Sequence, residues 1–300
     1  MKVSLVATVK DAGPALEPFL ESVRTQTYPP DEVVVVDGGS TDGTWGRLER
    51  ADGITAVSEP GANIARGRNV AVRAATHDVI AVTDADCVLD PDWLERLLEP
   101  LAAGADVVAG AYAPIASRPW QVAASAHVPD PEELRPGWMP SSRSLAFRRE
   151  AFDAAGGYPE WLAIGEDMFL NHRWIEQGVR IELAPAAVAR WRVRPSLGAT
   201  WRQYARYAEG DAAGGMYPER HLLRFGAYAL AITAALRGPR WLRLLLAVAV
   251  IGRAWKPGRR ALHRTKEPDR WKAAAMVPVL MALTDLAKMW GYAKGRLTKK

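Results

Sequence analysis

Short apolar runs alternate with longer amphipathic stretches over the first third of the chain. Runs of this length between turn residues predict buried strands. The intervening stretches have helical spacing, and Pro residues suit their first turns. The predicted strands are Ser4–Val9, Glu32–Val36, Ile54–Val57, Val79–Thr83 and Asp106–Gly110, and the predicted helices are Pro14–Thr25, Thr41–Arg50, Ala62–Ala75 and Pro91–Ala102.

This alternation predicts an α/β fold. Crossovers of this length require a Rossmann-like, mostly parallel sheet with helices on both faces. In such sheets, ligands bind at the carboxyl ends of the strands. A second block follows, with predicted strands Ser141–Phe147 and Val179–Leu183 and predicted helices Gly165–Gln177 and Gly198–Gly210. The Pro-rich segment 111–140 between the two blocks is expected to be an irregular loop that contacts an acceptor.

The composition changes near residue 218. Residues 219–300 hold 18 Lys or Arg and 4 Asp or Glu, a charge of about +14, so the rest carries about −9 within the net +5. We therefore predict two domains, residues 1–218 with the candidate site and residues 219–300 as a helical basic region. A basic region of this kind seeks an anionic partner such as a membrane surface.

The basic region contains two apolar stretches, Phe225–Leu236 and Trp241–Ile251. Each is shorter than the roughly 20 residues that a membrane-spanning helix needs. Joined by 237–240 and flanked by Arg and Trp, they predict a helical hairpin in the headgroup region, followed by an amphipathic stretch at Trp271–Tyr292. The alternative is a soluble helical cap on the first domain. Nucleic acid is not an expected partner, because no nucleic-acid-binding module is recognisable.

Cys87 is the single cysteine, so an intrachain disulfide is excluded and an oxidising compartment is not indicated. The apolar run up to Val9 is too short for a signal-peptide core. These features predict a cytoplasmic protein, held at the inner face of the plasma membrane by the basic region.

Asp37 is the first candidate for chemistry. It ends the run Val33–Val36 and opens the segment Asp-Gly-Gly-Ser-Thr-Asp-Gly-Thr. A carboxylate at the carboxyl end of a strand can accept hydrogen bonds from a base or a ribose. The alternative is a capped turn, in which Ser40 or Thr41 caps the next helix.

Asp84 and Asp86 follow the run Val79–Thr83 directly. Strand geometry would turn both carboxylates to the same side. Mg²⁺ or Mn²⁺ prefers oxygen ligands and often binds through one or two carboxylates together with substrate phosphates. The alternative is a solvated acidic turn before a helix, and the position relative to Asp37 favours the metal site.

Glu166 and Asp167 lie at the start of a predicted helix, after Gly165. One of the carboxylates could be a general base that removes a proton from an acceptor hydroxyl. Acidic residues are also favoured in a first helical turn because they complement the helix dipole. The residues alone leave both interpretations open.

Arg66 and Arg68 lie where a Gly-containing loop enters another predicted helix. Arg pairs readily with phosphate or carboxylate groups. The alternative is that both are surface charges.

Taken in order, five motifs resemble those of the family 2 glycosyltransferases with the GT-A fold. The resemblance covers about residues 1–211, and it implies that 1–218 is a catalytic domain of this kind. The motifs are Ala7-Thr8-Val9-Lys10-Asp11, the segment from Asp37 to Thr44, Arg68-Asn69, Asp84-Ala85-Asp86 and Gly165-Glu166-Asp167.

The resemblance implies a role for each matching residue. Thr8, Asp37, Arg68 and Asp84 would bind the donor, a nucleotide-sugar for which a UDP-sugar is the default. Asp86 would hold the divalent cation, Mn²⁺ or Mg²⁺, and Asp167 would be the catalytic base, with Glu166 toward the acceptor. A base that drives one in-line displacement inverts the anomeric carbon. The acceptor would be a glycan or a lipid-linked sugar.

Gln203 and Arg206 lie in Gln-Tyr-Ala-Arg-Tyr, which resembles the acceptor-side Gln-x-x-Arg-Trp element of processive members. The alternative is an amphipathic helix with Trp201 and Tyr204 packed inward. Two departures from the family pattern affect the details. Ala7, Val9 and Lys10 replace the usual Pro, Tyr and Asn, and the segment 190–195 has no His that could bind the cation.

Two rival functions are a nucleotidyltransferase that makes sugar nucleotides and an inactive scaffold of a membrane complex. The first would need a Gly-rich, Arg-containing loop after the first strand, and the segment 7–13 is a poor one. The second is disfavoured because Asp86 and Asp167 are intact.

Overall fold

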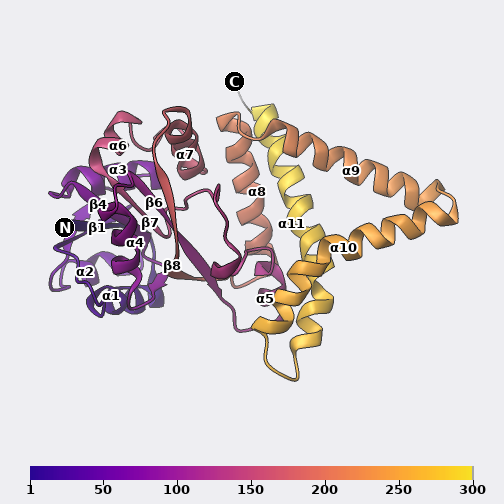
Figure 1. Cartoon of the computed structure of the whole chain (residues 1–300), viewed down its shortest axis with the longest axis horizontal. Coiled ribbons are helices and arrows are strands. Elements are labelled where there is room, and N and C mark those ends of the chain that lie inside the picture. Colours follow the sequence, from indigo (N-terminus) through magenta and orange to yellow (C-terminus); the bar gives the residue numbers. More distant parts are fainter. Residues whose placement is uncertain (299–300) are drawn as a thin grey trace. The chain divides into compact units, whose positions relative to one another are not determined.

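The computed structural model describes residues 1–298, and its strands form an eight-stranded sheet in the order β3-β2-β1-β4-β7-β6-β8-β5 (Figure 1). The strands are β1 Val3–Val9, β2 Glu32–Asp37, β3 Thr55–Ser58, β4 Val79–Asp84, β5 Cys87–Leu89, β6 Val107–Ile115, β7 Leu145–Arg148 and β8 Ile181–Arg192.

The sheet contains both parallel and antiparallel strand pairs. β3, β2, β1 and β4 pair in parallel, as predicted. β7 runs antiparallel to both β4 and β6, and β5 runs antiparallel to β8. The α/β fold class is confirmed, but the sheet is not parallel throughout. β6 and β8 lie side by side in parallel, because the Val107 N–H bonds to the Arg180 carbonyl and the Val193 N–H bonds to the Ile115 carbonyl. Apolar runs reveal a strand without revealing its direction, so the antiparallel strands β5 and β7 were not foreseen.

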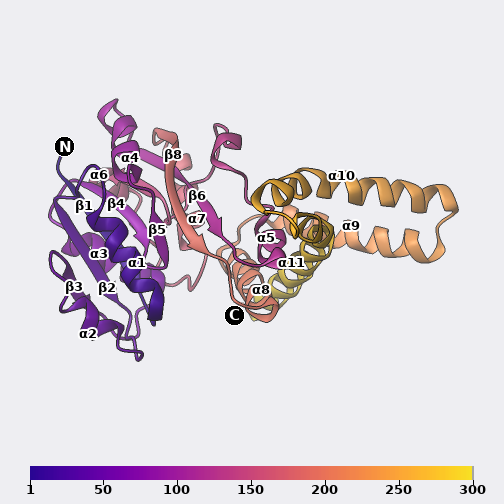
Figure 2. The same cartoon turned by 90° about the horizontal axis from the view of Figure 1, so that it is seen from below.

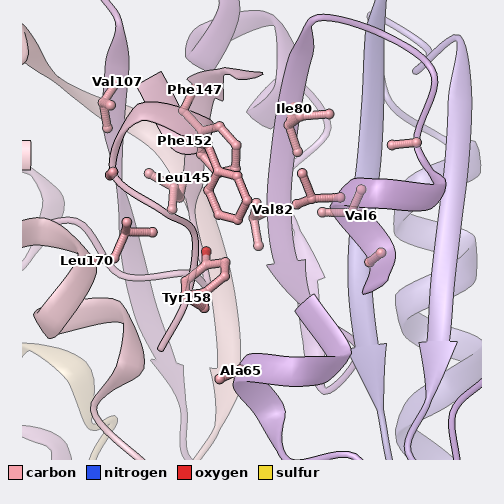
Figure 3. Close-up of a cluster of buried hydrophobic side chains, with 14 of the residues drawn as sticks. Val6, Ala65, Ile80, Val82, Val107, Leu145, Phe147, Phe152, Tyr158 and Leu170 are labelled. Carbon is pink, nitrogen blue, oxygen red and sulfur yellow. The ribbon is translucent and has the colours of Figure 1, made fainter. Parts of the chain in front are cut away.

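Helices cover both faces of the sheet (Figures 1 and 2). Alternate residues of a strand point to opposite faces, and Val33–Val36 of β2 are all buried. On one face, the rings of Phe147 and Phe152 are stacked (Figure 3), and Trp174 packs against Phe147. The helices of this part are α1 Leu16–Arg24, α2 Thr44–Leu48, α3 Ile64–Ala74, α4 Trp93–Ala102, α6 Arg149–Ala154 and α7 Glu166–Glu176.

The segment 111–140 is more ordered than the predicted irregular loop. β6 continues through it to Ile115, and helix α5 follows at Pro119–Ser125. Gln121 stabilises the start of α5, because its side-chain oxygen accepts hydrogen bonds from the backbone of Ser117 and Arg118. The sequence did not predict either element, because the many Ala and Pro residues of this segment show neither the two-residue hydrophobic period of a strand nor the 3.6-residue period of a helix.

The chain divides into two compact units, and the boundary differs from the predicted one at residue 218. The first unit comprises Met1–Ala113 and Asp130–Arg192, and the second comprises Pro114–Pro129 and the chain from Val193 onward. The predicted boundary followed a change in charge. The actual second unit also contains α5 and the less basic helix α8 (Leu197–Gly214), because these pack against α11.

The second unit is helical, as predicted for its basic part. α9 (Pro218–Arg237) and α10 (Arg240–Arg264) form a hairpin that extends away from the pair formed by α8 and α11 (Arg270–Thr298) (Figures 1 and 2). Gly291 and Gly295 of α11 face α8. A Cβ atom at Gly291 would lie 1.9 Å from the carbonyl oxygen of Ala205, so only glycine permits this approach.

A buried carboxylate fastens the hairpin to α11. Asp285 of α11 is 3% exposed. It accepts hydrogen bonds from Arg224 Nε at 3.1 Å and from the Tyr228 hydroxyl at 3.0 Å, both on α9, and it forms an ion pair with Arg253 of α10 at 2.7 Å. A buried charge of this kind is tolerated only when it is paired, so Asp285 ties three helices together.

The close helix contact gives a test of the second unit. We expect Gly291→Ala to lower the stability of the protein by about 1–3 kcal/mol, because the new methyl group forces α8 and α11 apart. Gly226→Ala on α9 is the matched control, since nothing lies within 4 Å of the added carbon. It should be neutral or raise stability by up to about 1 kcal/mol through helix propensity. Thermal unfolding measures both, and equal melting temperatures for the two variants would contradict the packing.

Candidate active site

The carboxyl ends of β1, β2 and β4 bring three predicted donor residues to one edge of the sheet. Thr8 on β1 lies opposite Asp84 on β4, and the next residue, Val9, lies opposite Asp37 on β2. Neighbouring strands are about 4.8 Å apart, so these side chains start from adjacent backbones. The strand register therefore places Thr8, Asp37 and Asp84 at one edge of the sheet.

One carboxylate oxygen of Asp37 has hydrogen-bond donors within the protein, and the other has none among the described residues. Its side chain is 1% exposed, and Oδ1 accepts hydrogen bonds from the backbone N–H groups of Gly39 and Ser40, both at 2.7 Å. Gly39 has φ +91°, a conformation that favours glycine. Oδ2 is buried and has no hydrogen-bond partner among the described residues. Because a buried polar atom without a partner is costly, Oδ2 suits a donor group on a ligand.

The capped-turn interpretation of this segment is wrong in its detail. α2 begins at Thr44, and its N-cap residue is Gly43, not Ser40 or Thr41. Ser40 instead accepts a hydrogen bond from the N–H of Asp11, and the Asp11 carboxylate accepts one from the N–H of Thr41. The loops after β1 and β2 are therefore joined to each other beside Asp37.

Asp84 and Asp86 differ in their surroundings. Asp84 ends β4, and its Oδ1 accepts a hydrogen bond from Arg68 Nη2 at 2.5 Å. Asp86 lies in the turn between β4 and β5, so the strand-based argument for a common side does not apply. Both carboxylates are partly exposed, whereas Ala85 between them is buried.

These carboxylates fit a divalent cation that is held mainly by its substrate. Asp86 offers hard oxygen ligands, while Asp84 is already paired with Arg68. The described residues contain no group of three or more His, Cys, Asp or Glu that could hold a metal ion. Mg²⁺ and Mn²⁺ accept one or two carboxylates when phosphates and water complete the coordination, so the residues present are sufficient.

Arg68 and Glu166 lie inside the protein rather than at an open surface. Arg68 is 2% exposed and Glu166 is 4% exposed, and they form a direct ion pair. Burial disfavours the charged form of Arg68 and by itself would lower its pKa. The negative charges of Asp84 and Glu166 have the larger combined effect, so the pKa of Arg68 is raised. This placement differs from the expectation that Arg68 contacts the donor and Glu166 faces the acceptor. The reason is a pairing between α3 and α7, 98 residues apart in the sequence.

Asp167 is the more accessible of the two carboxylates at the start of α7. It is partly exposed, and its Oδ1 accepts a hydrogen bond from the N–H of Met168 at 2.8 Å. Gly165, with φ +85°, precedes the helix and leads the chain into it. Burial raises the pKa of Glu166, and the negative charge of Asp167 adds to this effect. The two neighbouring acids are therefore distinct, one buried and ion-paired and the other accessible.

Sequence reasoning missed Arg143. Its Nε lies 3.9 Å from Asp84 Oδ2, and its guanidinium lies 5.7 Å from the ring centre of Tyr112 and 5.6 Å from that of Trp191. The rings come from β6 and β8. Arg143 thus adds a second positive charge near the carboxylates. No motif marks it, because its partners are distant in the sequence.

Gln203 and Arg206 lie on α8 in the second unit. Gln203 donates a hydrogen bond to the Tyr207 hydroxyl at 2.7 Å, whereas Arg206 is exposed and lines a groove with Trp201, Trp290 and Lys294. Their acceptor-side role stays a prediction.

Tyr204 points into the second unit, as the amphipathic-helix alternative states. Its hydroxyl lies 2.9 Å from Nε2 of His127. Burial lowers the pKa of His127 to about 4, so the ring is neutral. Because Nδ1 of His127 faces the Ala124 carbonyl at 3.0 Å, Nδ1 carries the proton and Nε2 accepts the hydrogen bond from Tyr204.

Two family models match this chain. The model described as glycosyl transferase family 2 matches residues 4–157, and the model described as glycosyl transferase family group 2 matches residues 135–286. The first covers the donor-side carboxylates, and the second covers Asp167 and most of the helical unit.

Curated relatives are glycosyltransferases and polysaccharide biosynthesis proteins. The O-antigen chain rhamnosyltransferase RfbN of Salmonella typhimurium is 28% identical over 210 residues, which are 63% of this chain and 66% of that protein. The succinoglycan biosynthesis protein ExoA of Rhizobium meliloti is 31% identical over 216 residues, 66% of this chain and 65% of that protein. The chain therefore spans slightly less than two thirds of the length of these relatives.

Solved structures share the fold over nearly the whole chain. The mannosyltransferase PcManGT from Pyrobaculum calidifontis, in complex with GDP-Man and Mn²⁺, has a TM-score of 0.60 at 24% identity and covers 96% of this chain and 87% of that one. TarS 1–349 of S. aureus, in complex with UDP, has a TM-score of 0.53 at 17% identity, over 99% and 91% of the two chains. Together with the family match, these likenesses show that the chain has the GT-A fold and belongs to glycosyl transferase family 2.

Proposed function

We propose that this enzyme transfers a sugar, with inversion, from a nucleoside diphosphate sugar to a hydroxyl group of a lipid-linked or envelope glycan. The observation that carries the proposal is the unpartnered, buried Oδ2 of Asp37 at the same sheet edge as Asp84 and Asp86. Ligands of open α/β sheets bind at this edge. Named relatives act on O-antigen and in succinoglycan biosynthesis, which supports a glycan acceptor.

The donor side is assigned from hydrogen-bonding capacity. Asp37 Oδ2 would accept a hydrogen bond from the base or the ribose, and Asp84 would contact the ribose beside Thr8. The identity of the base is open, because the structural neighbours bind GDP-Man in one case and UDP in the other. A thermal-shift panel of UDP- and GDP-sugars with Mn²⁺ or Mg²⁺ identifies the donor, since a ligand that binds only the folded state raises its stability.

The chemical step needs one positioned base. The acceptor O–H loses its proton to Asp167 while its oxygen attacks the anomeric carbon. The bond from that carbon to the diphosphate oxygen breaks, and its electron pair leaves with the diphosphate. A divalent cation, held by Asp86, would neutralise the charge that develops on this leaving group. One displacement on the face opposite the leaving group inverts the configuration.

Asp167 fits the base better than Glu166 does. A general base must reach the proton that it removes, and Asp167 is accessible whereas Glu166 is buried against Arg68. The family membership favours sugar transfer over both rival functions, the synthesis of sugar nucleotides and an inactive scaffold.

The α9–α10 hairpin is proposed to lie on the inner, cytoplasmic face of the plasma membrane. Its apolar side chains are exposed; Leu236, Leu244 and Val248, for example, are 74%, 68% and 66% exposed. An exposed apolar helix surface is unfavourable in water, so we expect the apolar side chains of the hairpin to contact a membrane. Exposed large side chains on the hairpin are Leu222, Leu223, Leu230, Ile232, Leu236, Trp241, Leu244, Leu245, Val248, Val250, Ile251 and Trp255.

The charges on the hairpin favour an orientation parallel to the membrane. Residues 225–236 and 244–252 carry no charge, and at 1.5 Å per residue they extend only about 18 Å and about 14 Å, short of the roughly 30 Å hydrocarbon core. Arg237, Arg240 and Arg243 lie at the tip, and Arg224 and Arg253 lie at the base. A hairpin that pierced the bilayer would place the tip arginines in hydrocarbon, whereas one that lies flat keeps them among anionic headgroups.

Among the described residues, α11 is the helix whose length and composition would allow it to cross a membrane, with a mean hydropathy of 1.3. One such helix is weak evidence for a span. The face of α11 that carries Gly291 and Gly295 packs against α8, and its residue Asp285 is buried. We therefore propose that α11 belongs to the core of the second unit.

The base assignment is tested by Asp167→Asn. Loss of a general base typically lowers turnover by about 10²–10⁴-fold, and the isosteric amide should leave donor binding unchanged. Turnover of the donor found in the panel measures the first effect, and thermal shift measures the second. Glu176→Gln, at the exposed opposite end of α7, is the control and should keep full activity. Near-normal turnover by the Asp167 variant would remove it as the base.

The metal assignment is tested by Asp86→Ala. We expect wild-type protein to bind UDP or GDP more tightly with Mn²⁺ than without it, because the cation joins the carboxylate to the diphosphate. Isothermal titration should show that this gain disappears in Asp86→Ala and persists in Asp52→Ala, an exposed carboxylate before β3. A gain of the same size in the Asp86 variant would show that the cation does not depend on this residue.

Flotation with vesicles tests the membrane proposal. The wild-type protein should float with vesicles that contain phosphatidylglycerol, and the variant Leu236→Ser, Leu244→Ser, Val248→Ser should stay in the soluble fraction. Trp161→Ser removes a side chain that is 61% exposed in the first unit and should float normally. A wild-type protein that stays soluble and sediments as a dimer would instead indicate that a second copy covers the hairpin.

A further inference from the structure

Arg68 joins two elements that carry different parts of the proposed reaction. Its Nη2 donates to Asp84 at the end of β4, at 2.5 Å, and its Nη1 donates to Glu166 at the start of α7. Asp84 belongs to the donor side. Glu166 directly precedes Asp167, the proposed base. One guanidinium therefore lies between the donor edge and the helix turn that presents the base.

The guanidinium is held in place on its other sides as well. It lies 5.5 Å from the ring centre of Tyr158, and the Tyr158 hydroxyl is 2.9 Å from the Ser142 hydroxyl. The next residue on α3, Asn69, donates a hydrogen bond to the Tyr158 carbonyl at 2.9 Å and accepts one from its N–H at 3.0 Å. The chain that leads from Tyr158 toward α7 is thus fastened to the same helix turn as Arg68.

The chemistry of arginine determines what such a contact can do. The guanidinium is planar and rigid, so its two terminal nitrogens hold two carboxylates at a set separation. Lysine would supply the same charge but only a single ammonium group, which cannot impose that separation. Two neighbouring carboxylates also repel each other, and the buried one, Glu166, would be costly without a cation.

We propose that Arg68 is a positioning residue that sets the distance between the donor carboxylate Asp84 and the base-bearing first turn of α7. The inference rests on the proposed function, because it takes Asp167 as the base. In this role Arg68 touches neither substrate. It acts through its ion pairs with Asp84 and Glu166. Through these pairs, the position of Asp167 depends on the position of Asp84.

The direct test is Arg68→Lys, which keeps the buried charge and removes the rigid fork. We expect kcat to fall by about 10–100-fold, because a displacement of about 1 Å in a reacting group has effects of this size. The KM for the donor and the affinity for UDP or GDP with Mn²⁺ should change by less than about threefold, since the ammonium group of the variant still pairs with Asp84. Arg66→Lys is the matched control, on the same helix but exposed and paired with Glu59, and should leave kcat unchanged.

A second variant covers the case in which Arg68→Lys does not fold. Glu166→Ala removes the α7 end of the contact and leaves the Arg68–Asp84 pair intact. The same loss of kcat with intact nucleotide binding is expected. If either folded variant keeps wild-type kcat, or if nucleotide affinity falls in parallel with kcat, Arg68 does not act as a positioning residue.

Hydrogen exchange separates this inference from the proposed function. The first amide of α7 that bonds to a backbone carbonyl is that of Phe169, whose N–H donates to the Gly165 carbonyl at 3.1 Å. Its exchange should be at least about 10-fold faster in Arg68→Lys and in Glu166→Ala, and unchanged in Arg66→Lys, because loss of the contact frees the first turn. If the wild-type enzyme turns over no nucleotide-sugar, the proposed function fails, while unchanged exchange in both variants overturns the positioning role alone.

Discussion

The pairing of two carboxylates with one guanidinium is the interaction on which the active site depends. The partly exposed Asp84 and the buried Glu166 come from different elements, and both form ion pairs with Arg68. Carboxylates that share a site repel each other unless a positive charge lies between them. Arg68 supplies that charge, and Arg143 lies 3.9 Å from the other oxygen of Asp84. Asp167 is accessible because Glu166, not Asp167, is paired with Arg68.

The two units differ in the kind of side chain that they expose. In the first unit, polar atoms are concentrated at one sheet edge, and the buried Asp37 Oδ2 is left for a ligand. In the second unit, the hairpin exposes apolar side chains, while the carboxylate of Asp285 is buried among Arg224, Tyr228 and Arg253. This buried ionic contact at the hairpin base helps to hold α9 and α10 to α11.

The sequence predicted the features that depend on local order. Asp37 and Asp84 end uninterrupted apolar runs, so their place at the carboxyl edge follows from the parallel strands. It could not predict features that depend on distant contacts. Nothing local indicates that Arg68 pairs with Glu166, 98 residues away, or that Arg143 lies beside Asp84. The domain boundary was misplaced for the same reason, because Pro114–Pro129 joins the helices from Val193 onward by packing, which composition does not reveal.

The central claim is that the carboxyl edge of β1, β2 and β4 is a nucleotide-sugar site in which Asp37 accepts a hydrogen bond from the nucleoside. The most direct measurement is isothermal titration of UDP and of GDP, with Mn²⁺, into the wild-type protein and Asp37→Ala. The account predicts that one of the two nucleotides binds the wild-type protein and that the variant binds it at least about 10-fold more weakly, the cost of about one charged hydrogen bond. Equal affinity in the variant, or no binding of either nucleotide to the wild-type protein, would contradict it.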